Sequence, residues 1–163
     1  RRECDTLTNR FPDGLWLLRD EHSRVILALC VENDEHSHGD RNPECESGKI
    51  EDTFQALQDK LAKEGAARGA VARHDANMVP IVTIRFNPNA YDKAIVKLAD
   101  RVKVLADLAN SYLHMNAAAI AKLQTHAPIL HVLYYHFKEG GKNLAHYAQH
   151  TVSAGWAYTV HAP

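Results

Sequence analysis

Two short apolar runs separated by a polar turn constrain the fold of this chain more than any other feature. The runs are Gly14-Leu15-Trp16-Leu17-Leu18 and Val25 to Val31, and the segment between them is Arg19-Asp20-Glu21-His22-Ser23-Arg24. Runs of this length on either side of polar turn residues are typical of two β-strands joined in a hairpin. Both faces of the two strands are apolar along most of their length, which indicates a sheet covered on both sides.

The turn between the two runs determines which residues lie opposite one another. We expect His22 and Ser23 to form a two-residue hairpin loop. The opposed pairs are then Leu17 with Ala28, Leu15 with Cys30, and Asp13 with Glu32. Opposed residues have Cβ atoms about 5 Å apart, close enough for two carboxylates to bind one divalent cation. Because side chains alternate at period two, Asp34 joins the face of Glu32 if the strand continues that far.

The remainder of the chain alternates helix and strand patterns. Apolar residues at helical spacing predict a helix over 49–61, ended by Gly65, with the buried stripe Ile50, Phe54, Leu57 and Leu61. Residues 65–77 are small and polar and predict a loop, and 80–86 form a β-branched strand. A long helix over 92–112 is expected to bury Ile95, Leu98, Val102, Leu105 and Leu108. Strands over 129–135 and 156–161, a turn at 139–142 and a short helix over 144–149 complete the order.

This order predicts an α/β fold: a mixed β-sheet flanked by helices, in an α/β/α sandwich. The 163 residues, 45% of them hydrophobic, are enough for one domain with a core. No run approaches the length of a membrane span, so we expect no membrane partner. The start at Arg1, with neither an initiator Met nor a signal peptide, suggests a piece of a longer protein.

Cysteine usage and charge limit the setting of the protein. Three cysteines without framework spacing indicate a reducing compartment, the nucleus or the cytoplasm. A net charge of −1 gives no general electrostatic attraction to nucleic acid, so a nucleic-acid partner would need a local patch of positive charge or segments outside this sequence.

The second apolar run ends in a strongly charged segment, Val31-Glu32-Asn33-Asp34-Glu35-His36-Ser37-His38. Unpaired buried carboxylates are strongly disfavoured, so these acids either sit in water or hold a cation. Phosphodiester hydrolysis needs a metal that polarises the phosphate and lowers the pKa of the attacking water, and Mg²⁺ binds a few carboxylates plus waters. Asp13, Glu32 and Asp34 meet that need, although acids at strand ends are also commonly just solvated.

Three basic side chains near these acids fit phosphate chemistry. An imidazole titrates near neutral pH, so His38 can act as general base or acid, or donate a hydrogen bond to phosphate. Lys49, one position from the helix's buried stripe, holds a phosphate, neutralises the acids or is a plain surface lysine. Arg85 ends a strand expected beside the hairpin, where it clamps phosphate or forms a structural ion pair.

A zinc site is the alternative, since thiolate and imidazole are the ligands that Zn²⁺ prefers. The candidate ligands are Cys30, Cys45, His36, His38 and His74. The pattern is poor, because the sequence has no C-x-x-C pair and Cys30 lies in an apolar run typical of an inert core thiol. A second group of candidate zinc ligands lacks the H-E-x-x-H motif. Its members are His126, His131, His136, His146 and His150.

Pro12-Asp13 before a strand, followed by Glu32-x-Asp34 with His38 four residues beyond, resembles the PD-(D/E)XK restriction-endonuclease-like superfamily. The nearest likeness is to the very-short-patch-repair and EDxHD homing endonuclease branch, whose E-x-D-x-x-x-H pattern precedes an acid on the next helix and a strand ending in Arg-Phe. The matching residues here are Glu32, Asp34, His38, Glu46 and Arg85-Phe86. Similar domains of algae, other protists and large viruses have a Cys-Glu pair before the helix, as Cys45-Glu46 here. The likeness covers residues 10–90.

The resemblance implies a Mg²⁺-dependent DNA endonuclease, a phosphodiester hydrolase in which Mn²⁺ can replace Mg²⁺. The implied roles are metal binding by Asp13 and Glu32, assistance by Asp34, proton transfer or phosphate contact by His38, and orientation of water or a second ion by Glu46. The commonest superfamily pattern has a lysine in the place of Asp34. Catalysis here therefore uses His38, moves the lysine role to Lys49, or is lost.

We therefore expect a single endonuclease-like domain over 1–163, with its motif-bearing core at about 10–90 and a C-terminal helix-strand extension over 91–163. Its partner is DNA, a homodimer is left open, and a DNA-targeting domain is expected outside this sequence. Two other functions stand beside this one: a catalytically inactive nuclease-like module that binds nucleic acid, and a His-rich zinc-binding protein.

Overall fold

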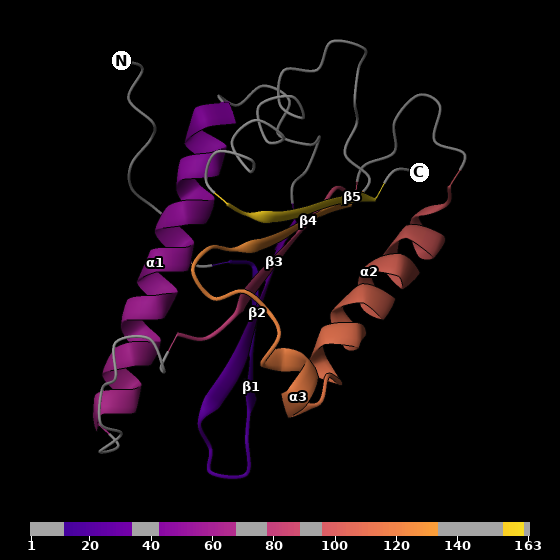
Figure 1. Cartoon of the computed structure of the whole chain (residues 1–163). Helices are drawn as coiled ribbons and strands as arrows, with labels where there is room; N and C mark the ends of the chain where they lie inside the picture. The colour runs from indigo at the N-terminus through magenta and orange to yellow at the C-terminus, as the bar shows by residue number, and fades with distance from the viewer. Residues whose placement is uncertain (1–11, 34–42, 68–77, 89–95, 134–154, 162–163) are drawn as a thin grey trace.

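A computed structural model describes residues 12–33, 43–67, 78–88, 96–133 and 155–161, with the side chains of the first helix described from Ser47 to Glu64. These residues form a five-stranded sheet in the order β1-β2-β3-β4-β5 (Figure 1). The strands are β1 (Gly14–Arg19), β2 (Val25–Asn33), β3 (Ile81–Phe86), β4 (Ile129–Leu133) and β5 (Ala157–His161). The helices are α1 (Pro43–Ala67), α2 (Leu98–Leu113) and α3 (Ala117–Ile120).

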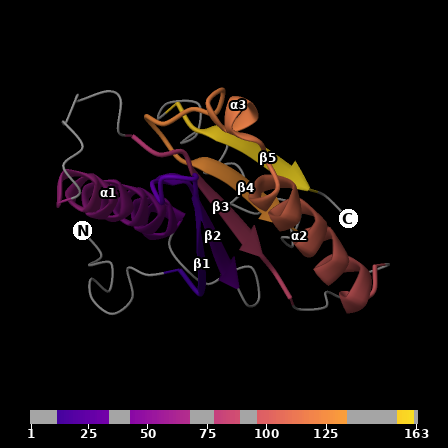
Figure 2. The same ribbon diagram turned by 90° about the horizontal axis from the view of Figure 1, so that it is seen from below.

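The sheet is mixed and covered on both faces, as the sequence predicts. β1 runs antiparallel to β2, while β2, β3, β4 and β5 run parallel to one another. Helix α1 lies on one side of the sheet, and α2 and α3 lie on the other (Figure 2). Parallel neighbours need a crossover connection, which α1 supplies between β2 and β3 and which α2 with α3 supplies between β3 and β4. The α/β prediction is therefore confirmed.

Helix α1 buries the predicted stripe but is longer than predicted. Ile50, Phe54, Leu57 and Leu61 are all less than a tenth exposed. The helix begins at Pro43, whose fixed φ suits a first helical residue, and it continues through Gly65 to Ala67. The predicted end at Gly65 is wrong because a glycine inside a helix costs only about 1 kcal/mol, and the strong helix formers Ala66 and Ala67 follow it.

The hairpin has the predicted register and a different turn. Leu15 pairs with Cys30 and Leu17 with Ala28, but the register shifts so that Arg19 pairs with Val25. The loop is Glu21-His22-Ser23, closed by a hydrogen bond from Asp20 N to Arg24 O at 2.9 Å. Ser23 has a φ of 60°, as a three-residue hairpin loop followed by a bulge requires at this position. The predicted two-residue loop is therefore wrong, and a bulge at the start of β2 absorbs the shift.

Replacing Ser23 by glycine is expected to stabilise the protein slightly. The left-handed backbone at Ser23 costs an L-residue about 1 kcal/mol that glycine avoids, partly offset by the greater entropy of glycine in the unfolded chain. We expect Ser23→Gly to raise the free energy of unfolding by about 0.5 kcal/mol. Urea denaturation checks this, and a loss of stability would contradict the turn described here.

Helix α2 faces the sheet with a different stripe from the one predicted. It begins at Leu98, after the non-helical residues Val96 and Lys97, and Leu98 and Val102 are 50% and 45% exposed. Its inward stripe begins with Arg101, which is 2% exposed and donates from Nη1 to Asn87 O at 3.3 Å. Leu105, Leu108 and Tyr112 continue that stripe against the core. The two buried predictions Leu98 and Val102 are therefore wrong, while Ile95 lies outside the described residues.

The remaining predicted elements divide into those that the structure describes and those that it does not. β3, β4 and β5 fall within the predicted strands over 80–86, 129–135 and 156–161. Helix α3 was not predicted, and its Ile120 packs into the core with Leu27 and Leu29. The turn at 139–142 and the helix over 144–149 lie outside the described residues. Of the helices in the described ranges, none is long and apolar enough to cross a bilayer.

Candidate functional site

The candidate site lies on the α1 face of the sheet, near the carboxyl ends of β2 and β3. Glu32 is the last but one residue of β2, and Arg85 stands beside it in the register of β3. Two residues earlier in both strands, Cys30 stands beside Thr83. Because side chains alternate, these four residues share the face that α1 covers. Ligand sites in open α/β sheets favour the carboxyl ends of parallel strands.

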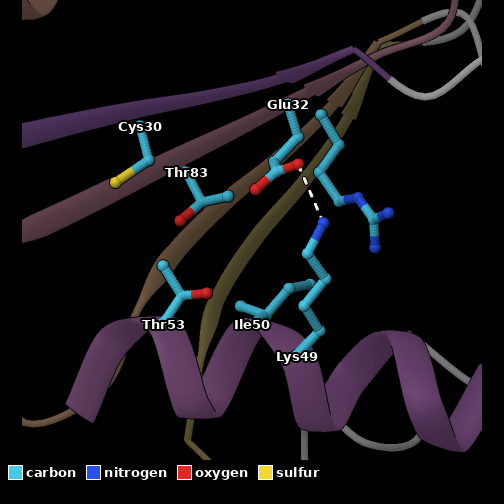
Figure 3. Close-up of a pocket in the computed structure, with 7 residues that line it drawn as sticks. Cys30, Glu32, Lys49, Ile50, Thr53 and Thr83 are labelled. Atoms are coloured by element: carbon cyan, nitrogen blue, oxygen red, sulfur yellow. Dashed lines mark hydrogen bonds and ion pairs between the residues drawn. The ribbon is translucent and has the colours of Figure 1, made fainter. Parts of the chain in front are cut away.

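Lys49 of α1 reaches across to Glu32. Its Nζ donates to Glu32 Oε2 at 3.1 Å, and the two side chains are 32% and 10% exposed (Figure 3). The position follows from the helix itself, because Lys49 directly precedes Ile50, the first residue of the buried stripe. The structure thus brings together two of the predicted site residues that are 17 positions apart.

These residues line a small pocket between the sheet and α1, with a cavity volume of about 10 Å³, which is room for about one water molecule (Figure 3). Its lining is Cys30, Glu32, Lys49, Ile50, Thr53, Thr83 and Arg85. The wall carries one carboxylate and two cations, and Arg85 is 1% exposed. A guanidinium keeps its charge even when buried, so the three charged side chains of the described lining together carry one net positive charge when Glu32 is ionised. This positive charge favours an anionic group such as a phosphate at the mouth of the pocket, because the interior has room for only about one water molecule.

Cys30 at the sheet side of the pocket is not a reactive thiol. Its burial, together with the negative charge of Glu32, raises the pKa of the Cys30 thiol to about 12. Nucleophilic attack needs the thiolate, which this environment disfavours at neutral pH. Cys30 therefore has the buried environment of the core thiol that the sequence indicates.

Asp13 stands at the outer end of the same hairpin. The pair Gly14 with Val31 continues the register that places Asp13 opposite Glu32. The Asp13 carboxylate is exposed, and its Oδ2 accepts a hydrogen bond from Asn33 N at 2.8 Å. This bond takes the place of the next ladder bond between the two strands and fixes the carboxylate at the end of β2.

The side chains of the other predicted acids and histidines of the site lie outside the described residues. Asp34, His36 and His38 lie in the segment 34–42, and Glu46 belongs to α1 but its side chain is outside the described set. Within the described ranges, no three or more His, Cys, Asp or Glu side chains gather where they could hold a metal ion. The described residues therefore supply two carboxylates, Asp13 and Glu32, at this end of the hairpin.

The sequence did not predict the pocket threonines, nor the contacts of His131 with Tyr112 and His161. Thr53 and Thr83 line the pocket, and their positions on the buried faces of α1 and β3 could have indicated this. On the opposite face of the sheet, Tyr112 Oη lies 2.7 Å from His131 Nε2, and His131 Nδ1 lies 3.2 Å from His161 Nε2. A histidine within the apolar strand Ile129–Leu133 was the available signal for these contacts.

Other members of the zinc alternative are not brought together by the described residues. His126 is exposed, and His131 contacts a tyrosine and a histidine rather than a cysteine. Cys45, His74, His136, His146 and His150 have no described side chains. Comparisons with known protein families, curated proteins and solved structures give no match for this chain.

Proposed function

We propose that this chain is a metal-dependent endonuclease that hydrolyses DNA phosphodiester bonds at the pocket between β2, β3 and α1. The observation that carries the proposal is the 3.1 Å contact between Lys49 Nζ and Glu32 Oε2 at the carboxyl end of β2. The superfamily pattern has a lysine where this chain has Asp34. In our proposal Lys49, from the next helix, takes the role of that lysine. The acid and the ammonium group meet in space although the sequence separates them.

The donor chemistry of the site fits Mg²⁺. Mg²⁺ commonly uses one or two carboxylates and keeps several waters, and Asp13 with Glu32 provides two carboxylates at the same end of the β1–β2 hairpin. Asp34 would add a third. When bound, the metal would polarise a phosphoryl oxygen and lower the pKa of a bound water.

The protein's own cations would bind the substrate. Lys49 is one third exposed, so its ammonium group can reach a phosphate at the mouth of the pocket while it stays near Glu32. Arg85 is held below the surface and adds a second positive charge behind it. Both charges favour the extra negative charge that develops on the phosphate during hydrolysis. In this proposal His38 transfers a proton or contacts the phosphate, and Glu46 orients water.

Removal of the Lys49 charge tests this role. We expect Lys49→Gln to lower Mg²⁺-dependent cleavage of duplex DNA by at least about tenfold, because a cation near the developing charge is lost. The matched control is Lys60→Gln, an exposed lysine of the same helix, which should cleave like the wild type. Gel assays with and without chelator measure both; equal activity of the two variants would remove Lys49 from the site.

A second function, nucleic-acid binding without hydrolysis, is favoured by one observation. Two cations and one carboxylate line the pocket, which suits an anion even in the absence of a metal. Under this function the wild type binds DNA, gives no cleavage with Mg²⁺ or Mn²⁺, and loses affinity in Lys49→Gln. Filter-binding and cleavage assays on the same samples separate the two functions.

A further inference from the structure

Strand β1 is an edge of the described sheet. It pairs with β2 alone, at one end of the strand order. An edge strand offers unpaired N–H and C=O groups to any other strand. The structure identifies which residues of β1 carry those groups.

The hydrogen bonds of the hairpin show the direction of each backbone group. Ala28 N donates to Pro80 O, so even-numbered residues of β2 point toward β3 and the odd-numbered ones toward β1. Asn33 N, which donates to Asp13, agrees with this alternation. The inward-bonding residues of β1 are therefore Gly14, Trp16 and Leu18, the partners of Val31, Leu29 and Leu27. The N–H and C=O groups of Leu15, Leu17 and Arg19 point outward, where no described strand pairs with them.

This edge lacks the usual protection against pairing. Natural edge strands carry a lysine, a proline, a bulge or another charge along their length, whereas residues 14 to 18 of β1 are glycine, leucine and tryptophan. Trp16 is 47% exposed, and its indole lies along the strand over Gly14, where a Cβ would come within 2.6 Å of the ring. Five uncharged residues with a half-exposed indole at their centre suit another apolar strand.

We propose that β1 pairs antiparallel with β1 of a second copy of this chain, so that the two sheets join around a two-fold axis at Trp16. The two indoles are then directly opposite each other at a non-hydrogen-bonded pair, where side chains come closest. Leu15 and Leu17 of one copy bond to Leu17 and Leu15 of the other through their outward backbone groups.

Charge favours this register over the register with its axis at Leu17. The outward groups lie on odd-numbered residues, so each hydrogen-bonded pair must join two odd positions. With the axis at Trp16, Asp13 of each copy faces Arg19 of the other, giving an attractive pair at both ends. With the axis at Leu17, Asp13 faces Glu21, which is a repulsive pair. The charges at this edge are thus complementary when the axis lies at Trp16.

Charge substitutions at the axis test the proposal without disturbing the core. Trp16→Lys places two like charges opposite each other, as does Trp16→Glu, so each variant alone should be a monomer in sedimentation velocity while the wild type is a dimer. An equal mixture of the two variants should form a heterodimer, because opposite charges then meet at the axis. This recovery also shows that both variants are folded.

The matched control is Val102→Lys, which removes a similarly exposed apolar side chain from α2. It should remain a dimer. The proposal is overturned by a wild type that stays monomeric up to high concentration, by a Trp16→Lys dimer, or by a mixture that stays monomeric. Concentration-dependent filaments of the wild type would also overturn it, since they would indicate open pairing of β1 with the other edge, β5.

Discussion

Glu32→Gln is expected to lower Mg²⁺-dependent DNA cleavage by about a hundredfold or more, a loss of roughly 2.7 kcal/mol or more of transition-state stabilisation. Glutamine has the shape of glutamate but no charge, so it is a much weaker ligand for a hard cation. Glu32 is the buried acid of the pocket and the partner of Lys49, so its charge serves both the proposed metal and the proposed phosphate-binding cation. Cleavage rates across a Mg²⁺ titration measure the effect.

The fold should survive this substitution. Lys49 is 32% exposed and can turn its ammonium group to water once its partner is neutral. Circular dichroism and urea denaturation should therefore show a folded protein close to the wild type. The matched control is Asp52→Asn, which neutralises an exposed acid three residues after Lys49 in α1. A Glu32→Gln protein that cleaves as fast as the control would show that Glu32 is not in the active site.

The hairpin shows how much local pattern can predict. Period-two alternation and two apolar runs were enough to place Leu15 opposite Cys30 and Leu17 opposite Ala28. The turn was not predictable in the same way, because its form depends on Ser23 adopting a left-handed backbone that serine does not favour by itself. The bulge at the start of β2 then restores the predicted register, so the error in the loop length does not reach the site.

Helix α2 shows where pattern fails. Its apolar residues lie on more than one side, and Leu105 and Leu108 fit both the predicted and the observed stripe. The choice is made by polar contacts outside the helix: Arg101 donates to the Asn87 carbonyl, and Tyr112 reaches His131. A stripe calculated from hydrophobicity cannot contain this information, because its decisive partners lie on β4 and in the segment after β3.

The candidate site contains one contact that the sequence could predict and one that it could not. Glu32 and Arg85 could be predicted as neighbours from strand order, since both end strands of one sheet. The contact of Lys49 with Glu32 could not, because it depends on the rotation of α1 over the sheet and on a long flexible side chain. Lys49 was accordingly one of three open choices for the missing lysine role.

Acidification is expected to destabilise the protein through His131. The imidazole is 8% exposed between α2 and the sheet, and this burial, with the neighbouring His161, lowers the pKa of His131 to about 4. Burial also lowers the pKa of His161, and it raises that of Tyr112, which therefore stays neutral. The ring contacts of His131 are with these two residues, one from α2 and one from β5.

The sign follows from proton binding in the two states. The unfolded chain takes up a proton at His131 near pH 6.5, whereas the folded protein does so only near pH 4. The stabilising contribution is therefore complete above about pH 6.5 and is lost progressively as the pH falls toward 4, where the loss reaches roughly 3 kcal/mol. Urea denaturation at a series of pH values measures this slope.

Carboxylates also titrate over this range and change the free energy of unfolding. The contribution of His131 is therefore measured with a variant whose side chain can still form hydrogen bonds but does not titrate. His131→Gln offers both a donor and an acceptor, and its stability difference between pH 7 and pH 4 should be smaller than that of the wild type by roughly 3 kcal/mol. His114→Gln, at an exposed histidine beyond the end of α2, should keep the wild-type slope. Parallel slopes for all three proteins would mean that His131 is not held neutral by its surroundings. A lower slope in His131→Gln alone would show that packing of α2 against β4 and β5 depends on a neutral imidazole.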